Sequence, residues 1–178
     1  MLRNRTKDVK VVTDVTDEPV TLQEAKDFLK ISYSDEDALI EGLIMASRQL
    51  LEKLLNISIA TKTLKATFTH DGCYPYQIPY GPVGNITEAK FQYDAEDGSI
   101  TTTDYTLIGE DFKEFKGRAG YWVVTYDAGY TETPEALKQG ILKQVAWMYE
   151  NRGDEGKTGE VNKDVLYMLA GFNKNAWI

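Results

Sequence analysis

TLQEAKDFLKI (residues 21–31) and SDEDALIEGLIMASRQLLEKLL (residues 34–55) form one helical block of this sequence, and TPEALKQGILKQVAWMYENR (residues 133–152) forms a second. In each stretch the apolar residues recur every three or four positions, which is the period of an amphipathic helix. Helices with such apolar stripes cannot bury them alone. The two blocks are therefore expected to pack on each other across the long segment that separates them.

Capping residues indicate where the first two helices begin. Thr21 and Glu24 form a T-x-x-E capping box at the start of a short helix. Ser34 is interpreted as the N-cap of the second helix, because three acidic residues follow it, where the helix dipole favours negative charge. The second helix is expected to run to about Leu55, with Asn56 as its C-cap.

The second block predicts a third helix and a short last one. Thr133 is interpreted as the N-cap and Pro134 as the first helical residue, where a missing N–H costs nothing. The third helix is expected to end near Asn151. Residues 153–160 are polar and glycine-rich and predict a flexible linker, and residues 161–170 predict a short helix.

The second helix carries more apolar residues than one face requires. One stripe consists of Leu39, Leu43, Ala46, Leu50 and Leu54, and Ile40, Ile44, Leu51 and Leu55 widen it. A stripe this wide predicts burial on two sides, in a core or at a subunit contact. The residues that we expect on oligomer or core faces are Leu43, Leu50 and Leu54 here and Ile141, Val145 and Tyr149 in the third helix.

Between the helical blocks the period changes to two, which is typical of β-strands. Residues 61–69 alternate, with Leu64, Ala66 and Phe68 on one face. Further strands are expected at residues 88–93, 105–108, 111–115 and 120–126, separated by turn residues. The prolines within residues 76–86 predict only an edge strand or a turn there. Such short strands indicate a small antiparallel sheet or barrel.

Together these elements predict an α+β fold, in which a small helical bundle carries an inserted antiparallel β-sheet or small barrel. The bundle has three main helices and a short C-terminal helix. The expected domain organisation is an extended N-terminal arm (1–20), a helical core (21–56 and 131–152), a β-rich insertion (57–130), and a linker, short helix and C-terminal tail (153–178).

Composition excludes several classes of protein. The net charge is −8, and only the first ten residues are clearly basic, with four bases and one acid. Proteins that grip DNA phosphates usually cluster Lys and Arg, so this balance argues against stable DNA binding. No apolar run is long enough for a membrane span, and no signal sequence is evident. The single cysteine, Cys73, excludes an internal disulfide and a cysteine-based zinc site.

No motif predicts a catalytic, cofactor or metal site. His70 and Cys73 flank an Asp-Gly pair that is typical of an ordinary turn, and a catalytic thiolate would need a base and an orienting group around it. Asp94, Glu96 and Asp97 lack the spacing of a calcium loop. Residues 153–158 only partly match a phosphate loop, since a helix precedes them and their acids would oppose phosphate.

The middle of the chain is rich in aromatic residues, namely Tyr74, Tyr76, Tyr80, Phe91, Tyr93, Tyr105, Tyr121, Trp122 and Tyr126. Alternation predicts that most of them pack on the face of a sheet. Some could instead form a platform for a sugar or a partner protein.

The helical blocks and the tail resemble the head-tail connector (adaptor) proteins of long-tailed phages and prophages, in the branch with a β insertion between the helices. The matching residues are Thr21, Leu22, Glu24, Ala25, Lys26, Leu29, Asp35, Asp37, Leu43, Ile44, Ala46 and Ser47, then residues 134–139 and 149–152, and finally Val165, Leu166 and Leu169. The resemblance covers about half the chain. This sequence departs from it at Gly140, where the family prefers alanine, and a glycine there weakens the match or marks a close helix contact.

The resemblance implies a structural protein of the virion, made in the host bacterial cytoplasm, that joins head to tail. Such connectors form a ring of roughly a dozen copies through a heterologous, closing interface. The implied partners are further copies of the chain, the portal protein, and a tail-side connector or stopper protein, with DNA passing through without specific binding. In similar proteins the C-terminal tail reaches the portal, so Phe172, Trp177 and Ile178 are candidates for that contact. Acids within residues 35–56 or 94–114 are candidates to line the channel.

Two other classes compete with this interpretation. A small binding module could use the aromatic β segment as a platform for a carbohydrate or a protein. An enzyme would need acid–base groups that one histidine and scattered carboxylates do not assemble.

Overall fold

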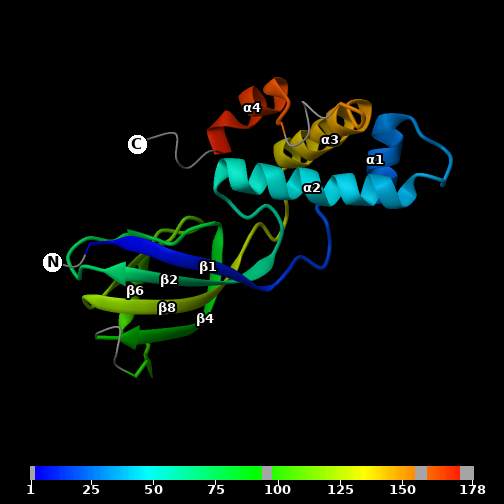
Figure 1. Cartoon of the computed structure of the whole chain (residues 1–178). Helices are drawn as coiled ribbons and strands as arrows, with labels where there is room; N and C mark the ends of the chain where they lie inside the picture. Colours follow the sequence, from blue (N-terminus) through cyan, green and yellow to red (C-terminus); the bar gives the residue numbers. More distant parts are fainter. Residues whose placement is uncertain (1–2, 94–97, 155–159, 173–178) are drawn as a thin grey trace. The chain divides into compact units, whose positions relative to one another are not determined.

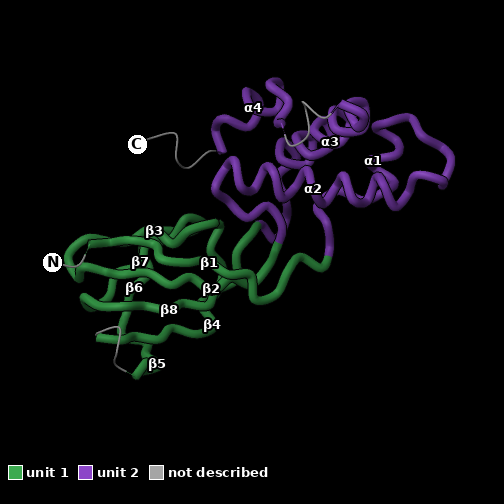
Figure 2. The backbone as a smooth tube through the Cα atoms, in the orientation of Figure 1, with its two compact units in different colours: residues 1–16, 61–129 green, residues 17–60, 130–178 purple. Residues whose placement is uncertain are grey.

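The computed structural model describes residues 3–93, 98–154 and 160–172 of the chain. It divides into two compact units, each built from separate stretches of sequence (Figure 2). The β unit comprises residues 1–16 and 61–129, and the helical unit comprises residues 17–60 and 130–178.

The described part of the helical unit contains four α-helices (Figure 1). They are α1 (Leu22–Leu29), α2 (Asp37–Leu55), α3 (Glu135–Glu150) and α4 (Lys163–Leu169), and a 3-10 turn (Ala170–Phe172) follows α4. The predicted capping box is confirmed, because the Thr21 side chain accepts from the Glu24 N–H while Glu24 accepts from the Thr21 N–H at 2.7 Å. Asn56 ends α2 in the left-handed region, as expected of a C-cap. None of the described helices is long and apolar enough to cross a membrane.

Two predicted caps are wrong. Residues 34–36 form a turn, so α2 begins at Asp37, and Ser34 contributes only its carbonyl, which accepts from the Asp37 N–H at 3.2 Å. Pro134 has an extended ψ of 139° and is the N-cap of α3, not its first helical residue. The Thr133 hydroxyl donates to the Ile59 carbonyl at 3.4 Å, so it does not cap the helix.

The core of the helical unit lies where α2 meets α3. Ile40, Ile44, Leu51 and Leu55 of α2 and Leu137, Ile141, Leu142 and Val145 of α3 are all buried. Burying one such side chain is worth roughly 1.5–3 kcal/mol, so these residues supply much of the stability of the unit. The two contributing segments are far apart in the sequence, as the paired helical blocks predicted.

A buried ion cluster joins α2 to the chain segments on either side of it. The Arg48 guanidinium, 2% exposed, donates to both carboxylate oxygens of Glu18, at 2.7 and 3.0 Å. It also donates to Glu52 at 3.0 Å, and Glu52 in turn accepts from the Ile59 N–H at 2.8 Å. A buried arginine with paired carboxylates is tolerated because the hydrogen bonds offset its desolvation.

The β unit consists of two antiparallel sheets. The five-stranded sheet has the order β1 (Arg5–Thr13), β2 (Lys62–His70), β8 (Gly120–Ala128), β4 (Val83–Gln92), β5 (Ile100–Thr101). The three-stranded sheet has the order β3 (Tyr76–Gln77), β7 (Glu114–Gly117), β6 (Tyr105–Ile108). Residues 5–13, which fall within the predicted N-terminal arm, are therefore an edge strand paired with β2.

The inner faces of both sheets form an aromatic core. Phe115 lies at its centre, with ring centroids 4.7 Å from Trp122 and 5.2 Å from Phe68 and Tyr105. Tyr76, Phe91 and Tyr126 are also buried, and the Tyr126 hydroxyl donates to the Pro79 carbonyl at 2.6 Å. The expectation that most of the aromatic residues pack on a sheet face therefore holds, and the buried ones cannot form a binding platform.

The chain leaves the helical unit and re-enters it at adjacent points. Ala60 and Tyr130 form an isolated parallel β-bridge, and these residues immediately precede and follow the long insertion. The predicted boundaries at residues 57 and 130 lie close to these points.

Helix α4 is held on α3 by apolar and polar contacts. Val165 and Leu169 are fully buried, and Leu169 lies against Gly140 of α3. The buried Gln144 side chain donates to the Glu160 carbonyl and accepts from the Asn162 N–H, both at 2.9 Å. Gly140 thus lies at a close contact between helices. This was one of the two explanations offered for a glycine at a position where the resembled family prefers alanine.

We predict that Gly140→Ala is less favourable than Gly42→Ala. Both glycines are helical, so alanine should gain about 1 kcal/mol of helix propensity at either position. A Cβ at Gly42 would meet nothing within 4 Å, whereas one at Gly140 would lie 2.7 Å from Leu169 Cδ1. Urea unfolding should place Gly140→Ala at least about 1 kcal/mol below Gly42→Ala. Equal gains would contradict the crowding.

Candidate functional site

Helix α2 presents two different faces. Ile40, Ile44, Leu51 and Leu55 are in the core, whereas the adjacent stripe of Leu39, Leu43, Ala46, Leu50 and Leu54 remains partly open to solvent. Leu39 is 40% and Leu54 37% exposed, and the other three are half-buried. A row of partly exposed leucines along one helix is a candidate contact surface. We call these five residues the α2 stripe.

The residues predicted for oligomer or core faces divide between these two environments. Ile141 and Val145 lie in the core of the helical unit. Leu43, Leu50 and Leu54 belong to the α2 stripe. Tyr149 is half-buried and takes part in a polar cluster at the end of α3.

This polar cluster joins the start of α2 to the end of α3. The Tyr149 and Tyr33 hydroxyls both donate to Glu36 Oε2, the latter at 3.1 Å. Arg152 stacks on Tyr149, with its guanidinium carbon 4.3 Å from the ring centroid, and lies 3.6 Å from Glu36 Oε1. Two tyrosines and an arginine thus surround one carboxylate at the surface.

Hydrogen bonding shifts the pKa values in this cluster. Hydrogen bonds to Tyr149 and then to Glu36 raise the pKa of Tyr33 to about 12. The hydrogen bond from Tyr149 holds the pKa of Glu36 below its ordinary value of 4.5. At neutral pH Tyr33 is therefore neutral and Glu36 is ionised, which suits a hydrogen bond from the hydroxyl to the carboxylate. Sequence analysis missed it, because Tyr33 and Tyr149 are 116 residues apart and no local pattern links them.

The three predicted tail residues are only partly described. Phe172 ends the 3-10 turn after α4 and is half-buried. Trp177 and Ile178 lie outside the described residues. The structure therefore shows where the tail begins, on the α4 side of the helical unit.

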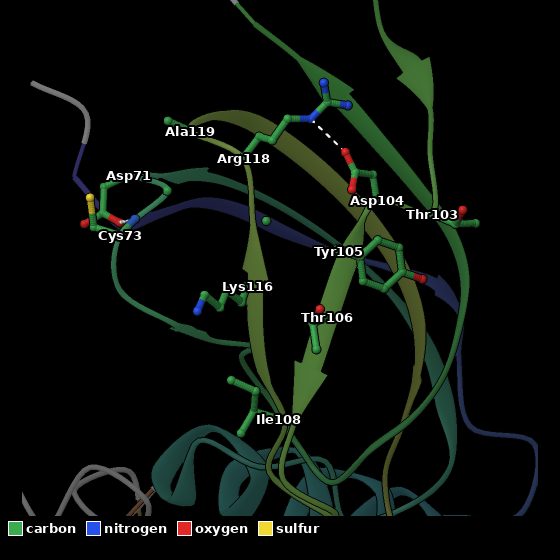
Figure 3. A pocket seen from close by; sticks show the side chains of 12 residues that line it. Asp71, Cys73, Thr103, Asp104, Tyr105, Thr106, Ile108, Lys116, Arg118 and Ala119 are labelled. Carbon is green, nitrogen blue, oxygen red and sulfur yellow. Dashed lines mark hydrogen bonds and ion pairs between the residues drawn. The ribbon is translucent and has the colours of Figure 1, made fainter.

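The β unit carries a shallow concavity of about 790 Å³ (Figure 3). Lys116 and Arg118 line it along one strand, and Figure 3 shows Thr106 and Ile108 on the neighbouring strand and Asp71 on the facing turn. The Arg118 guanidinium is 3.2 Å from the Asp104 carboxylate. The exposed aromatic side chains elsewhere in this unit, such as Tyr74 and Tyr93, do not line the concavity. Tyr105 does line it (Figure 3), but this half-buried ring stacks on Phe115 of the core, so one aromatic residue and not a platform faces the concavity.

His70 and Cys73 lie in different environments, and His70 Nε2 is one of the buried side-chain atoms of the described residues that have no hydrogen-bond partner. His70 is fully buried, its Nδ1 accepts from the Gly72 N–H at 2.9 Å, and its ring contacts Phe115 edge-on. Cys73 is exposed, and its N–H donates to the Asp71 side chain in the turn. With Nδ1 occupied by a backbone N–H, the imidazole is not available there as a base for the thiol.

The described residues form no site that would bind a metal ion, and they include little of the partial phosphate-loop match. In those residues no three His, Cys, Asp or Glu side chains are grouped so that they could hold a metal ion. The acids at positions 94, 96 and 97 and most of the partial phosphate-loop match lie outside the described residues.

Comparison with known proteins identifies similar chains. A model of the head completion protein family matches residues 18–161. No curated protein matches the chain significantly. A chain in "Neck of empty GTA particle computed with C6 symmetry" has a TM-score of 0.75 at 18% identity, covering 94% of this chain and 95% of that chain.

Two further solved structures show the same likeness. A chain in "Virion of native gene transfer agent (GTA) particle" has a TM-score of 0.74 at 16% identity, covering 93% of this chain and 94% of that one. A chain in "Neck of native GTA particle computed with C12 symmetry" has a TM-score of 0.71 at 16% identity, covering 94% and 95%. At these identities the matches show a shared fold over nearly the whole of both chains.

We expect Tyr149→Phe to destabilise the protein more at neutral pH than in acid. Removing the hydroxyl takes a donor from Glu36, so the pKa of Glu36 should return toward 4.5. A lowered carboxyl pKa contributes stability above the unfolded pKa and loses it as the pH falls through the folded pKa. Urea unfolding at neutral pH and at about pH 3 should therefore show the difference from wild type shrinking in acid.

Tyr167→Phe provides the matched control, since Tyr167 on α4 is 82% exposed. It should change stability little at either pH. A loss for Tyr149→Phe that is the same at both pH values would show that the hydroxyl does not act through the Glu36 carboxylate.

Proposed function

The chain belongs to the head completion protein family, and from this premise we propose that it forms a ring beneath the portal of a phage-like particle and joins the head to the tail. The observation that carries the proposal is the shared fold, over 94% of this chain, with chains from necks of gene transfer agent particles. The family is one of structural proteins, which supports a role for the chain as a building block of the particle.

The symmetry of those necks supports the ring. One was computed with C6 and the other with C12 symmetry, and both contain a chain of this fold. A closed ring needs a heterologous interface, in which one surface of each subunit contacts a different surface of the next. The α2 stripe fits such a contact, because it is apolar, continuous along the helix, and partly exposed in the isolated chain.

The proposed partners follow from the place of such a ring. The portal protein lies on its head side and a connector or stopper protein on its tail side, and the DNA passes through without sequence-specific binding. The C-terminal segment that starts at Phe172 is the proposed contact with the portal, with Trp177 and Ile178 as its apolar anchors. The competing binding-module interpretation has less support, since most of the aromatic residues it would need are in the core of the β unit.

We predict that Leu43→Asp with Leu50→Asp prevents ring formation and leaves the chain folded. Charges within an apolar subunit contact would be desolvated on assembly, which costs several kcal/mol per ion. Both leucines are only half-buried in the isolated chain, so the helical unit should keep its structure. Native mass of the chain, alone and together with the portal protein, reports assembly, and circular dichroism reports the fold.

Gln49→Asp is the matched control, because Gln49 is exposed on α2 outside the stripe. It should leave ring assembly unchanged. Rings of normal mass from the double variant would exclude the α2 stripe as a subunit contact.

Deleting residues 171–178 should abolish binding to the portal protein without reducing the melting temperature. The deletion removes Phe172 and all residues after it, while the buried Val165 and Leu169 keep α4 docked on α3. Co-sedimentation with purified portal protein measures the binding, and the truncated chain should still assemble with itself. Undiminished portal binding by the truncated chain would disprove the tail contact.

A further inference from the structure

Basic side chains gather at one edge of the β unit. They are Arg3, Arg5, Lys7 and Lys10, at or just before β1, and Lys65 on β2, and all five are exposed. We call these five residues the basic strip. It stands out because the whole chain carries a net charge of −8.

The strand register places Lys65 directly beside Lys10. The two residues are Cα partners in the antiparallel pairing of β1 with β2. Leu64 and Ala66 of β2 are buried, so alternation places Lys65 and its partner on the opposite, outer face of the sheet. Like charges directly opposite each other destabilise a sheet, so this pair has a cost that the fold does not require.

Little in the β unit neutralises the basic strip. Asp8 approaches Lys10 at 3.4 Å, but the Lys10 and Asp8 side chains are 75% and 52% exposed, which makes the pair weak. Across the described ranges, no carboxylate lies within 4.0 Å of the other four bases. The next acids on this face are engaged elsewhere, since Glu88 pairs with Lys90 and Asp127 accepts from Thr63.

Protection of an exposed sheet edge explains only part of the basic strip. Lysines and β-bulges on edge strands prevent unwanted strand pairing, and β1 has register shifts between Thr6 and Asp8 and between Val11 and Thr13. Lys65, however, is on β2, which lies between β1 and β8 and has no free edge. Edge protection therefore does not account for Lys65.

The backbone under the basic strip is held firmly in place. Asn4 donates to the Tyr74 carbonyl at 2.8 Å and accepts from the Asp71 N–H at 2.9 Å. The Thr69 hydroxyl donates to the Arg3 carbonyl at 2.7 Å, and the Thr6 and Tyr76 hydroxyls are 2.6 Å apart. A preorganised row of charges loses little backbone entropy when it binds a partner.

We propose that the basic strip contacts the phosphate backbone of double-stranded DNA. This inference rests on the proposed function, in which DNA passes through the ring. Residues 3–10 in extended form span about 25 Å, and a duplex presents one negative charge per roughly 1.7 Å of its axis, so several phosphates lie within reach of one strip. Contacts made only by charged side chains carry no sequence information.

Charge also limits the strength of this contact. The acidic remainder of the chain repels DNA, so the basic strip guides a moving duplex without retaining it. DNA matches the strip because its bases follow one another along an extended strand, as phosphates follow one another along a duplex, and the exposed Val11 and Val12 lie only beyond the Lys10 end of this row.

The test compares two triple variants with the same change in net charge. The strip variant carries Arg5→Glu, Lys10→Glu and Lys65→Glu. The control variant carries Lys30→Glu, Lys53→Glu and Lys143→Glu, at three exposed positions of the helical unit. Fluorescence anisotropy with a short, random-sequence DNA duplex, across a salt series, measures the affinity of each protein.

The strip variant should bind DNA at least about tenfold more weakly than the control variant, and its slope of log K against log salt should be smaller by about three. If both variants lose the same DNA affinity, the loss comes from the change in net charge, and the inference is wrong. The inference is also wrong if the wild-type protein does not bind DNA at low salt. If the strip variant fails to fold, Arg5→Gln, Lys10→Gln and Lys65→Gln replace it, with glutamines also in the control.

A second measurement, the joining of heads to tails in assembled particles, tests the proposed function independently of DNA binding. Particles built with the strip variant should still join heads to tails. Unchanged DNA binding together with a loss of joining would indicate an acidic protein partner and overturn the DNA contact. If particles that lack the chain altogether still join heads to tails, the proposed function itself fails, whatever the DNA measurement shows.

Discussion

The contact between α2 and α3 is the constraint on which the helical unit depends. Each helix buries much of its apolar face against the other, and the two come from segments on opposite sides of the β-rich insertion. Arg48 reinforces this arrangement, because it holds Glu18 ahead of α1 while Glu52 holds the Ile59 backbone after α2. The insertion therefore starts from a chain segment that is already fixed by buried hydrogen bonds.

Much of this fold could be predicted from the sequence, because helices and strands have local periodic signals. The Thr21 capping box, the Asn56 C-cap and the alternation of Leu64, Ala66 and Phe68 all identify elements correctly. The predicted N-cap Ser34 was wrong by two residues and the predicted first helical residue Pro134 by one, since turn geometry ahead of a helix depends on backbone angles that side-chain types only bias. The pairing of β1 with β2 joins residues far apart in the sequence, so no local pattern could indicate it.

The candidate surfaces show the same limit. The width of the apolar face of α2 predicted contacts on two sides, and the structure divides that face into a core and the partly exposed α2 stripe. The cluster around Glu36 and the pairing of Lys10 with Lys65 both depend on residues that meet only in the folded chain. The spacing of apolar residues predicts helices and strands well, but it does not predict which side chains from distant parts of the sequence lie on the same surface.

The bridge between Ala60 and Tyr130 has a consequence for how such a protein can evolve. Because the chain departs and returns at adjacent points, residues 61–129 could be lost or exchanged without moving α2 away from α3. Among the described strands, the N-terminal strand β1 pairs only with β2, which lies within that stretch. A descendant that lost the insertion would keep β1 without a strand partner, and the N–H and C=O groups of β1 would lose their hydrogen bonds to β2. Selection would then remove residues 5–13 as well, so the two segments are expected to be inherited, or discarded, together.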